Sequence, residues 1–396
     1  MCSTGWTRRD FLTTAAAAGV ALAGASAVTG TAEAVAAAEP AALPTRTALT
    51  NVRVFDGRTL SAPTTVVITG RLIGGSAVGA RTVDGRGGTL LPGLIDSHVH
   101  LRDLDTLSQL TRYGVTTALD MACWPPSLVD SLRRRPGRTD IRSAGVPATA
   151  PGSPQSQAPG YPANGVVAGP DQARQFVAAR VREGSDYIKV IVDVPGLSQA
   201  TLNALVSASH AAGKQVMAHA AANATVSEAL AAGADMIHHV PLDSVLTATQ
   251  VGQYATRRRT SVPTLTMMEG FAGLGVPGWS YATARDSVAA LQRAGVQILA
   301  GSDANVTPGV PVNPAFGVSL HRELELLVGA GLSTAAALRA ATSVPASAFG
   351  LRDRGAIRPG YRADLLLIEG DPTADIRTTR NIQRVWAGGV EYTPAG

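Results

Sequence analysis

Two histidines separated by a single residue are the strongest chemical feature of this sequence. His98 and His100 end the apolar run 90–100, which reads LLPGLIDSHVH. If this run is a β-strand, side chains two residues apart point to the same face of the sheet. Both imidazoles could then reach one divalent metal ion, for which imidazole is a common ligand.

Other residues of metal-ligating type lie at the ends of further apolar runs. His219 ends the run VMAH, His239 lies in MIHHV, and Asp303 ends LAGSD. Four of the seven histidines thus lie at or next to the ends of strand-like runs. Because the catalytic groups of β/α barrels gather at the carboxyl ends of the strands, these residues predict one shared site.

Lysine is rare in this chain, and one of its two copies lies in a strand-like run. Of the 34 lysine and arginine residues only Lys189 and Lys214 are lysines, and Lys189 lies in the run DYIKV. A lysine amine can lose its proton and add carbon dioxide to form a carbamate that bridges two metals, whereas a guanidinium stays charged. We therefore expect N6-carboxylation of Lys189; an ordinary salt-bridged lysine is the alternative.

The elements that must position these residues alternate between strand-like and helical patterns from about residue 90 to residue 354. Eight candidate strands occur, and this number predicts an α/β fold of the (β/α)8 TIM-barrel type. The alternative is a doubly wound open sheet, which usually has fewer units. The candidate strands are Leu94–His100, Val115–Met121, Ile141–Val146, Tyr187–Val192, Gln215–His219, Met236–Val240, Ser261–Met267 and Gln297–Asp303.

Short β-type runs flank this region at both ends of the chain. Residues 45–89 and 355–396 contain such runs between Gly- and Pro-rich turns, and we expect them to form one composite β-sandwich domain beside a barrel of residues 90–354. Two long connections, 149–169 and 268–279, follow the third and seventh candidate strands. Loops at that end of a barrel usually build the substrate pocket.

The first 38 residues resemble a twin-arginine signal peptide. Arg8 and Arg9 precede an Ala-rich apolar run, and small residues surround Ala37, so we expect cleavage to leave a mature chain starting near Glu39. An uncleaved anchor is the alternative. The hypothesis makes the protein secreted or extracytoplasmic, exported by the twin-arginine machinery, with no stable membrane insertion after cleavage.

The composition excludes several other classes of protein. The chain is 45% hydrophobic with a net charge of only +5, and its arginine clusters 133–135 and 257–259 lack interleaved aromatic residues, so nucleic acid is not an expected partner. After cleavage Cys123 would be the single cysteine, which excludes an intramolecular disulfide. We expect a free core or pocket thiol there. A homo-oligomer is compatible with this composition.

Taken together, these residues resemble the amidohydrolase superfamily, in its imidazolonepropionase-like and prolidase-like branch. The resemblance extends from about residue 51 to the C-terminus. It rests on the segment 91–100, the Ile188-Lys189 pair, His219, His239, the Gly-Ser-Asp segment 301–303, the helix 323–327 with 340–342, and the segment 360–365.

The resemblance implies two divalent metal ions, most often zinc. His98, His100, carboxylated Lys189 and Asp303 would hold the more buried metal, and Lys189, His219 and His239 the more exposed one. A hydroxide between the metals would attack a small amide such as a dipeptide or an N-acyl amino acid. Asp303 would take the proton and deliver it to the leaving nitrogen.

The sequence also departs from the family pattern. Many relatives have a glutamate before the sixth-strand histidine, whereas this chain has His238, whose side chain should point away from that of His239 on a strand. Residues 140–170 contain no histidine, although relatives often have one there. A mononuclear cyclic amidohydrolase or deaminase, and a non-catalytic ligand-binding barrel, therefore stay open as alternatives.

Overall fold

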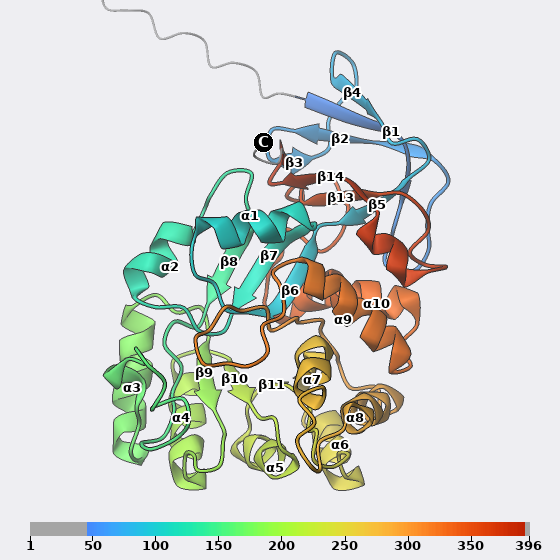
Figure 1. Cartoon of the computed structure of the whole chain (residues 1–396). Coiled ribbons are helices and arrows are strands. Elements are labelled where there is room, and N and C mark those ends of the chain that lie inside the picture. Colours follow the sequence, from blue (N-terminus) through green and yellow to red (C-terminus); the bar gives the residue numbers. More distant parts are fainter. Residues whose placement is uncertain (1–45, 393–396) are drawn as a thin grey trace, which may run out of the picture. The chain divides into compact units, whose positions relative to one another are not determined.

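The structure is a computed structural model that describes residues 46–392 (Figure 1). The predicted signal segment 1–38 lies outside the described residues. Among the helices of the described part, none is long and apolar enough to cross a bilayer.

Strands from the two ends of the chain pair in one mixed sheet, as the sequence predicted (Figure 1). The order of its strands is β15-β14-β13-β5-β1-β2-β3, with β4 beside β1. Strand β5 belongs to this sheet, so the predicted boundary at residue 90 falls inside a strand. The β-sandwich arrangement stays a prediction. The strands are β1 (Arg46–Val54), β2 (Thr64–Thr69), β3 (Leu72–Ile73), β4 (Arg81–Asp84), β5 (Thr89–Pro92), β13 (Leu365–Ile368), β14 (Ile382–Ala387) and β15 (Val390–Glu391).

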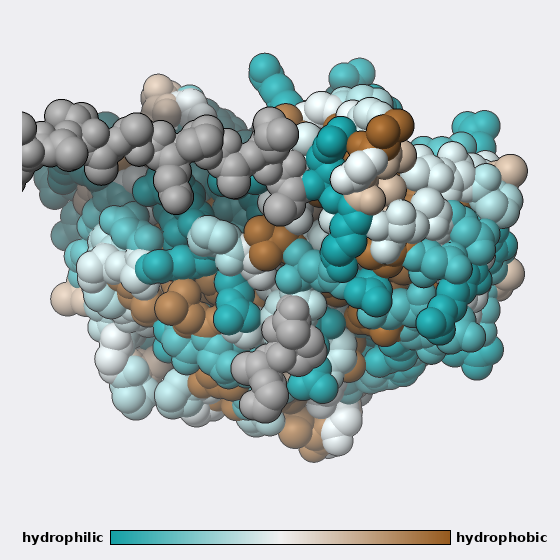
Figure 2. Space-filling model, turned by 90° about the horizontal axis from the view of Figure 1, so that it is seen from above, coloured by the Kyte–Doolittle hydropathy of each residue, from teal (hydrophilic) through white to brown (hydrophobic). Residues whose placement is uncertain are grey.

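Apolar side chains from both ends of the chain fill one core of this sheet. Leu49 and Ile68 from the N-terminal strands pack with Leu365 and Trp386 from the C-terminal strands, and all four are buried. Seen from above the view of Figure 1, the molecule presents mainly hydrophilic residues with small apolar patches between them (Figure 2). Burial of shared apolar surface thus holds the two ends of the chain together.

The central part of the chain alternates strands and helices, which makes the fold α/β. Its strands form two parallel ladders, β6-β7-β8 and β9-β10-β11-β12. The strands are β6 (Leu94–Val99), β7 (Val115–Asp120), β8 (Asp140–Ser143), β9 (Ile188–Ile191), β10 (Val216–His219), β11 (Met236–His238) and β12 (Thr260–Val262). The helices are α1 (Leu104–Arg112), α2 (Pro126–Leu132), α3 (Pro170–Arg182), α4 (Gln199–Ala211), α5 (Asn223–Ala232), α6 (Ala248–Thr256), α7 (Leu265–Ala272), α8 (Tyr281–Arg293), α9 (Val318–Gly329), α10 (Thr334–Ala340) and α11 (Ser343–Ala348), with short 3-10 turns η1 (Ala163–Gly165) and η2 (Ile376–Arg380).

The two ladders are not one continuous sheet. Isolated parallel bridges join Ala148 to Val190, Ser261 to Ile298 and Val99 to Ala304. The closed barrel therefore stays a prediction, which these three contacts support.

Two of the predicted strands are wrong in part. Gln297–Asp303 forms no regular strand, because its pairing is limited to the bridge at Ile298 and the chain turns at Asp303, where φ is 56°. The seventh strand ends at Val262, and residues 265–267 begin α7 instead. Thr264, with φ of 48°, makes that turn.

Alternating side chains of the parallel strands pack into different cores. On β10, Met217 packs with Ile95, Leu119 and Met236, whereas its neighbours Val216 and Ala218 pack with the helices. Lys189 pairs in register with Met217, and His219 pairs with His238. Lys189 and His219 therefore share the inner face with Met217.

Arg354 joins the C-terminal part of the chain to the parallel ladder. Its Nη1 donates to Oδ2 of Asp140 at 2.8 Å and to Oγ1 of Thr117 at 3.0 Å, and both carboxylate and guanidinium are buried. Replacing Arg354 with alanine should leave the buried negative charge of Asp140 without its nearest positive partner. We expect Arg354→Ala to lower the free energy of unfolding by about 3 kcal/mol, measured by urea denaturation.

The matched control is Arg352→Ala, because Arg352 is exposed and forms no ion pair among the described residues. An equal loss of stability in both variants would contradict this role of Arg354.

Candidate metal centre

Three predicted ligands come together at the carboxyl end of β6. The ligand atoms of His98, His100 and Asp303 all lie within 4.8 Å of one another. Nε2 of His100 is 2.9 Å from Oδ1 of Asp303, and Nε2 of His98 is 3.3 Å from the same oxygen. Two imidazole nitrogens and one carboxylate at this spacing suit a divalent metal.

The protonation chemistry of these groups also suits a metal. Burial lowers the pKa of His98 well below its usual value, which favours the neutral imidazole that a metal needs. Oδ1 of Asp303 is buried without a hydrogen-bond donor of suitable geometry. A buried carboxylate oxygen in this state is a ready metal ligand.

Asp96 fixes the two segments that carry these ligands. Its Oδ1 accepts hydrogen bonds from the backbone N–H groups of His98 and Ser302, at 3.2 and 2.9 Å, and its Oδ2 accepts from the Ser302 hydroxyl at 2.5 Å. The backbone N–H of Asp303 also donates to the carbonyl of His98. Burial raises the pKa of Asp96 to about 7, and the bonds from Ser302 oppose this rise.

Gly301 is required by the close approach of the same two segments. A Cβ atom at this position would lie 2.7 Å from Cγ1 of Val262 and 3.0 Å from Cβ of His98. The glycine of the Gly-Ser-Asp segment therefore lets Asp303 approach β6.

The side chains of His238 and His239 both lie near His98, although neighbouring residues of a strand normally point to opposite faces. Nδ1 of His238 lies 3.0 Å from Nδ1 of His98, and the two rings meet edge to face. Strand β11 ends at His238, and His239 has φ of 73°, so its ring turns back toward His98 with 5.1 Å between the ring centroids. The expectation that the two side chains point apart is therefore wrong.

His239 is held by a hydroxyl group on one side and lies close to the predicted ligands on the other. Its Nδ1 is 2.8 Å from Oγ1 of Thr264 and 3.8 Å from Oδ2 of Asp303. The ring of His219 meets that of His239 at 4.4 Å between centroids. Such hydrogen bonds fix the orientation and the tautomer of a ligating histidine.

Glu323 on α9 makes the hydroxyl of Thr264 available. Thr264 is the N-cap residue of α7, yet its side chain accepts no capping bond. Instead, Glu323 accepts from the N–H groups of Leu265 and Thr266 at 3.0 and 2.8 Å. No local sequence pattern indicates this contact, because 57 residues separate Glu323 from Thr266.

Lys189 is buried at the inner face without a partner. Its Nζ forms no hydrogen bond and no ion pair among the described residues, which disfavours the salt-bridged alternative. Burial lowers the pKa of Lys189 to about 7, and the charges of Asp303 and Asp120 oppose this. A buried amine of low basicity is the form that reacts with carbon dioxide.

The six predicted residues thus differ in how closely they gather. His98, His100 and Asp303 form the compact group, whereas His239, His219 and Lys189 lie around it on the neighbouring strand ends. Nε2 of His219 also lies 3.7 Å from Oδ1 of Asp193, a residue that was not among the predicted site residues. The helical histidines have other partners: His210 pairs with Asp235, and His321 with Thr379 and Tyr113.

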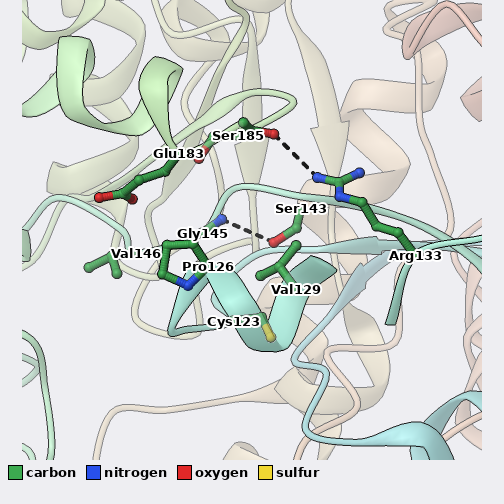
Figure 3. Close-up of a pocket in the computed structure, with 10 residues that line it drawn as sticks. Cys123, Pro126, Val129, Arg133, Ser143, Gly145, Val146, Glu183 and Ser185 are labelled. Atoms are coloured by element: carbon green, nitrogen blue, oxygen red, sulfur yellow. Dashed lines mark hydrogen bonds between the residues drawn. The ribbon is translucent and has the colours of Figure 1, made fainter. Parts of the chain in front are cut away.

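Cys123 is a buried cysteine outside the group of predicted metal ligands. It is buried, and burial raises the pKa of its thiol far above the usual value. The cavity beside it, lined also by Val129 and Arg133, holds only about 10 Å³ (Figure 3). This is room for one water molecule, so the expectation of a free core thiol holds.

The α/β fold and the histidine–aspartate group define a class of metal-dependent hydrolases. The chain belongs to the amidohydrolase family, whose pattern matches residues 89–391.

Curated relatives match short parts of the chain. Adenine deaminase from Methylobacterium sp. strain 4-46 is 40% identical over 79 residues, which are 20% of this chain and 13% of the enzyme. Imidazolonepropionase from Deinococcus deserti is 37% identical over 99 residues, 24% of each protein. The matched regions therefore span about a quarter or less of these relatives.

Solved structures match over most of the chain. A Xaa-Pro dipeptidase with bound methionine in its active site has a TM-score of 0.76 at 23% identity, covering 88% of this chain and 100% of the dipeptidase. Molinate hydrolase has a TM-score of 0.72 at 20% identity, covering 88% of this chain and 95% of that enzyme. At these identities the likeness concerns the fold.

Replacing Glu323 tests whether α7 positions His239. We expect Glu323→Ala to weaken metal binding at least about tenfold, because the freed N–H groups would compete for the Thr264 hydroxyl and His239 would lose its orientation. Glu323→Gln should lose less metal affinity, since its amide oxygen can still accept a hydrogen bond from one of these N–H groups. The measurement is a metal-binding titration with a competing chelator.

The control is Glu325→Gln on the same helix, whose carboxylate pairs with Arg322 and Arg380 at the surface. A thermal shift in Glu323→Ala with unchanged metal affinity would show that Glu323 stabilises the fold without positioning His239.

Proposed function

We propose that this protein is an enzyme that hydrolyses a carbon–nitrogen amide bond with the help of divalent metal ions. The observation that carries the proposal is the compact group of His98, His100 and Asp303 at the carboxyl end of β6 in a chain of the amidohydrolase family. The favoured substrates are a dipeptide, an N-acyl amino acid or a related small amide. The dipeptidase among the structural neighbours supports this class.

His98, His100 and Asp303 would hold one metal, and His219, His239 and carboxylated Lys189 would complete a two-metal site. Zinc is the proposed occupant, because imidazole nitrogens and carboxylate oxygens are ligands that it accepts. Divalent metals in such a site make hydroxide available near neutral pH and polarise a carbonyl group.

Asp303 carries the proton transfer in this proposal. Its carboxylate would accept the proton of the attacking water and donate it to the leaving nitrogen. Oδ1 lies next to His98 and His100, whereas Oδ2 lies toward His239, so the carboxylate spans the group. This placement supports a shared role of Asp303 as ligand and proton carrier.

The long connections of the parallel region are the proposed sites of substrate selection. Tyr161, in the connection 149–169, packs edge to face against Trp124 with 5.8 Å between the ring centroids. Trp279 packs in the same way against Phe271, with 6.0 Å between the centroids. Aromatic walls of this kind commonly shape a small-molecule pocket.

We further propose that residues 90–354 close into a (β/α)8 barrel beside a β-sandwich formed by residues 45–89 and 355–396. The three isolated parallel bridges support closure. Export by the twin-arginine route is also a proposal, supported by the arginine pair and the Ala-rich run near the N-terminus.

A mononuclear cyclic amidohydrolase or deaminase is the second candidate. The compact group contains three ligands only, and the sequence relatives include an adenine deaminase and an imidazolonepropionase. Ammonia release from amino-purines or ring opening of cyclic amides would identify this function.

Metal content tests the two-metal site. We expect about two metals per chain in the mature protein and a loss of at least one in Lys189→Ala, because the bridging ligand is removed. The measurement is elemental analysis after reconstitution with zinc and bicarbonate.

Lys214→Ala is the matched control, since it removes the other lysine, whose Nζ donates to the carbonyl of Ser185. One metal per chain in the wild type and in Lys189→Ala alike would refute the carbamate. Absence of metal after reconstitution would refute the hydrolase proposal as a whole.

Asp303→Asn tests the proton transfer. An amide cannot accept the proton of the attacking water, so we expect kcat on the best amide substrate to fall about 100-fold or more. The substrate is first chosen from a panel of dipeptides, N-acyl amino acids and cyclic amides. If metal-loaded Asp303→Asn keeps the wild-type kcat, another residue carries the proton.

A further inference from the structure

An arginine-rich cavity lies at the opposite ends of the strands from the metal centre. The cavity has a volume of about 610 Å³. Asp140 is the first residue of β8, and Asp186 precedes β9, and both line the cavity. The strands are parallel, so their amino ends lie at the face opposite to the one that carries His100 and His219.

The charge of the cavity is strongly unbalanced. Seven arginines and three aspartates line it, and the buried carboxylate of Asp364 also pairs with Arg362 at 2.9 Å, which leaves an excess of three positive charges. The arginines come from separate parts of the chain, so the end of a single helix does not account for them. They are Arg71, the run 133–135, Arg142, Arg354 and Arg362.

The three aspartates that line the cavity already pair with the more buried arginines. Asp353 lies 2.9 Å from Arg354. Asp140 lies 2.8 Å from Arg354, 3.4 Å from Arg142 and 3.5 Å from Arg362. Asp186 lies 2.8 Å from Arg133 and 3.7 Å from Arg142.

Three exposed guanidinium groups are left over. Arg71, Arg134 and Arg135 line the cavity without an acidic partner among residues 46–392. A concave site that gathers uncompensated positive charge attracts and concentrates anions.

We propose that this cavity binds a small molecule that carries two or more phosphate groups. Two phosphate monoesters carry a charge of about −3 to −4 near neutral pH, which is close to the excess of three positive charges. Guanidinium groups pair with phosphate oxygens through two parallel hydrogen bonds. The volume is that of a small-molecule site, and no aromatic side chain lines it, so a stacked nucleobase has no platform.

The binding site differs from the metal centre and is independent of the proposed hydrolysis. Arg71 lies in the turn between β2 and β3, and Arg134 follows α2, so the ligand would join the mixed sheet to the parallel ladder. Binding of such a ligand to the folded chain would raise the thermal stability of the protein.

The test is isothermal titration of the metal-loaded mature protein with fructose 1,6-bisphosphate. We expect saturable binding that weakens with added salt, and a Kd raised about tenfold or more in the double variant Arg71→Gln/Arg134→Gln, because each lost contact is a charge-assisted hydrogen bond. Arg293→Gln, at the exposed end of α8, is the control and should bind as the wild type does.

Hydrogen exchange of the wild type gives an independent readout, with protection expected at residues 133–142 and 353–362. Equal affinity of the double variant and the wild type would overturn the proposal, as would binding that is lost in His100→Ala instead. Tricarballylate carries three carboxylates and no phosphate. If it binds as tightly as fructose 1,6-bisphosphate, the cavity does not select phosphate groups.

Discussion

The buried carboxylate of Asp96 holds together the two segments on which the metal centre depends. One of its oxygens accepts from the backbone of His98 and of Ser302, and the other accepts from the Ser302 hydroxyl. The histidine pair and Asp303 lie more than 200 residues apart in the sequence, and the second segment forms no regular strand. Backbone hydrogen bonds such as that from the Asp303 N–H to the His98 carbonyl join the two segments, the Asp96 carboxylate reinforces them, and Gly301 permits the close contact.

Departure from regular strand geometry completes the centre. His239, Thr264 and Asp303 all have positive φ, although none is a glycine. Such backbone conformations cost free energy and persist only where the surroundings hold them. Glu323 accepts from the first N–H groups of α7, Thr264 contacts His239, and Asp303 is fixed through its neighbour Ser302. At each of these three residues, the positive φ turns the side chain toward the centre. The alternation of a regular strand would point the same side chain in another direction.

The sequence predicted the elements of the fold better than the details of the centre. Local patterns placed β6, β10 and β11 within one or two residues, because buried strands and their ends leave periodic signals. Strands from the two chain ends lie in one sheet, while the composite β-sandwich domain stays a prediction. The irregular segment before Asp303 and the start of α7 were missed, since contacts with Asp96 and Glu323 from distant parts of the chain determine them. The relative direction of the His238 and His239 side chains was predicted wrongly, because His239 leaves the strand.

The parallel direction of the strands also separates two kinds of charge in this protein. Imidazoles and carboxylates gather at the carboxyl ends, where Lys189 is buried without an ion pair among residues 46–392. Arginines gather at the amino ends, where Asp140 and Asp186 are shared among them. A guanidinium next to Lys189 would pair with the Asp303 carboxylate and repel a metal cation. Several of the arginine ion pairs lie at the opposite strand ends, so the Asp303 carboxylate stays available to a metal ion.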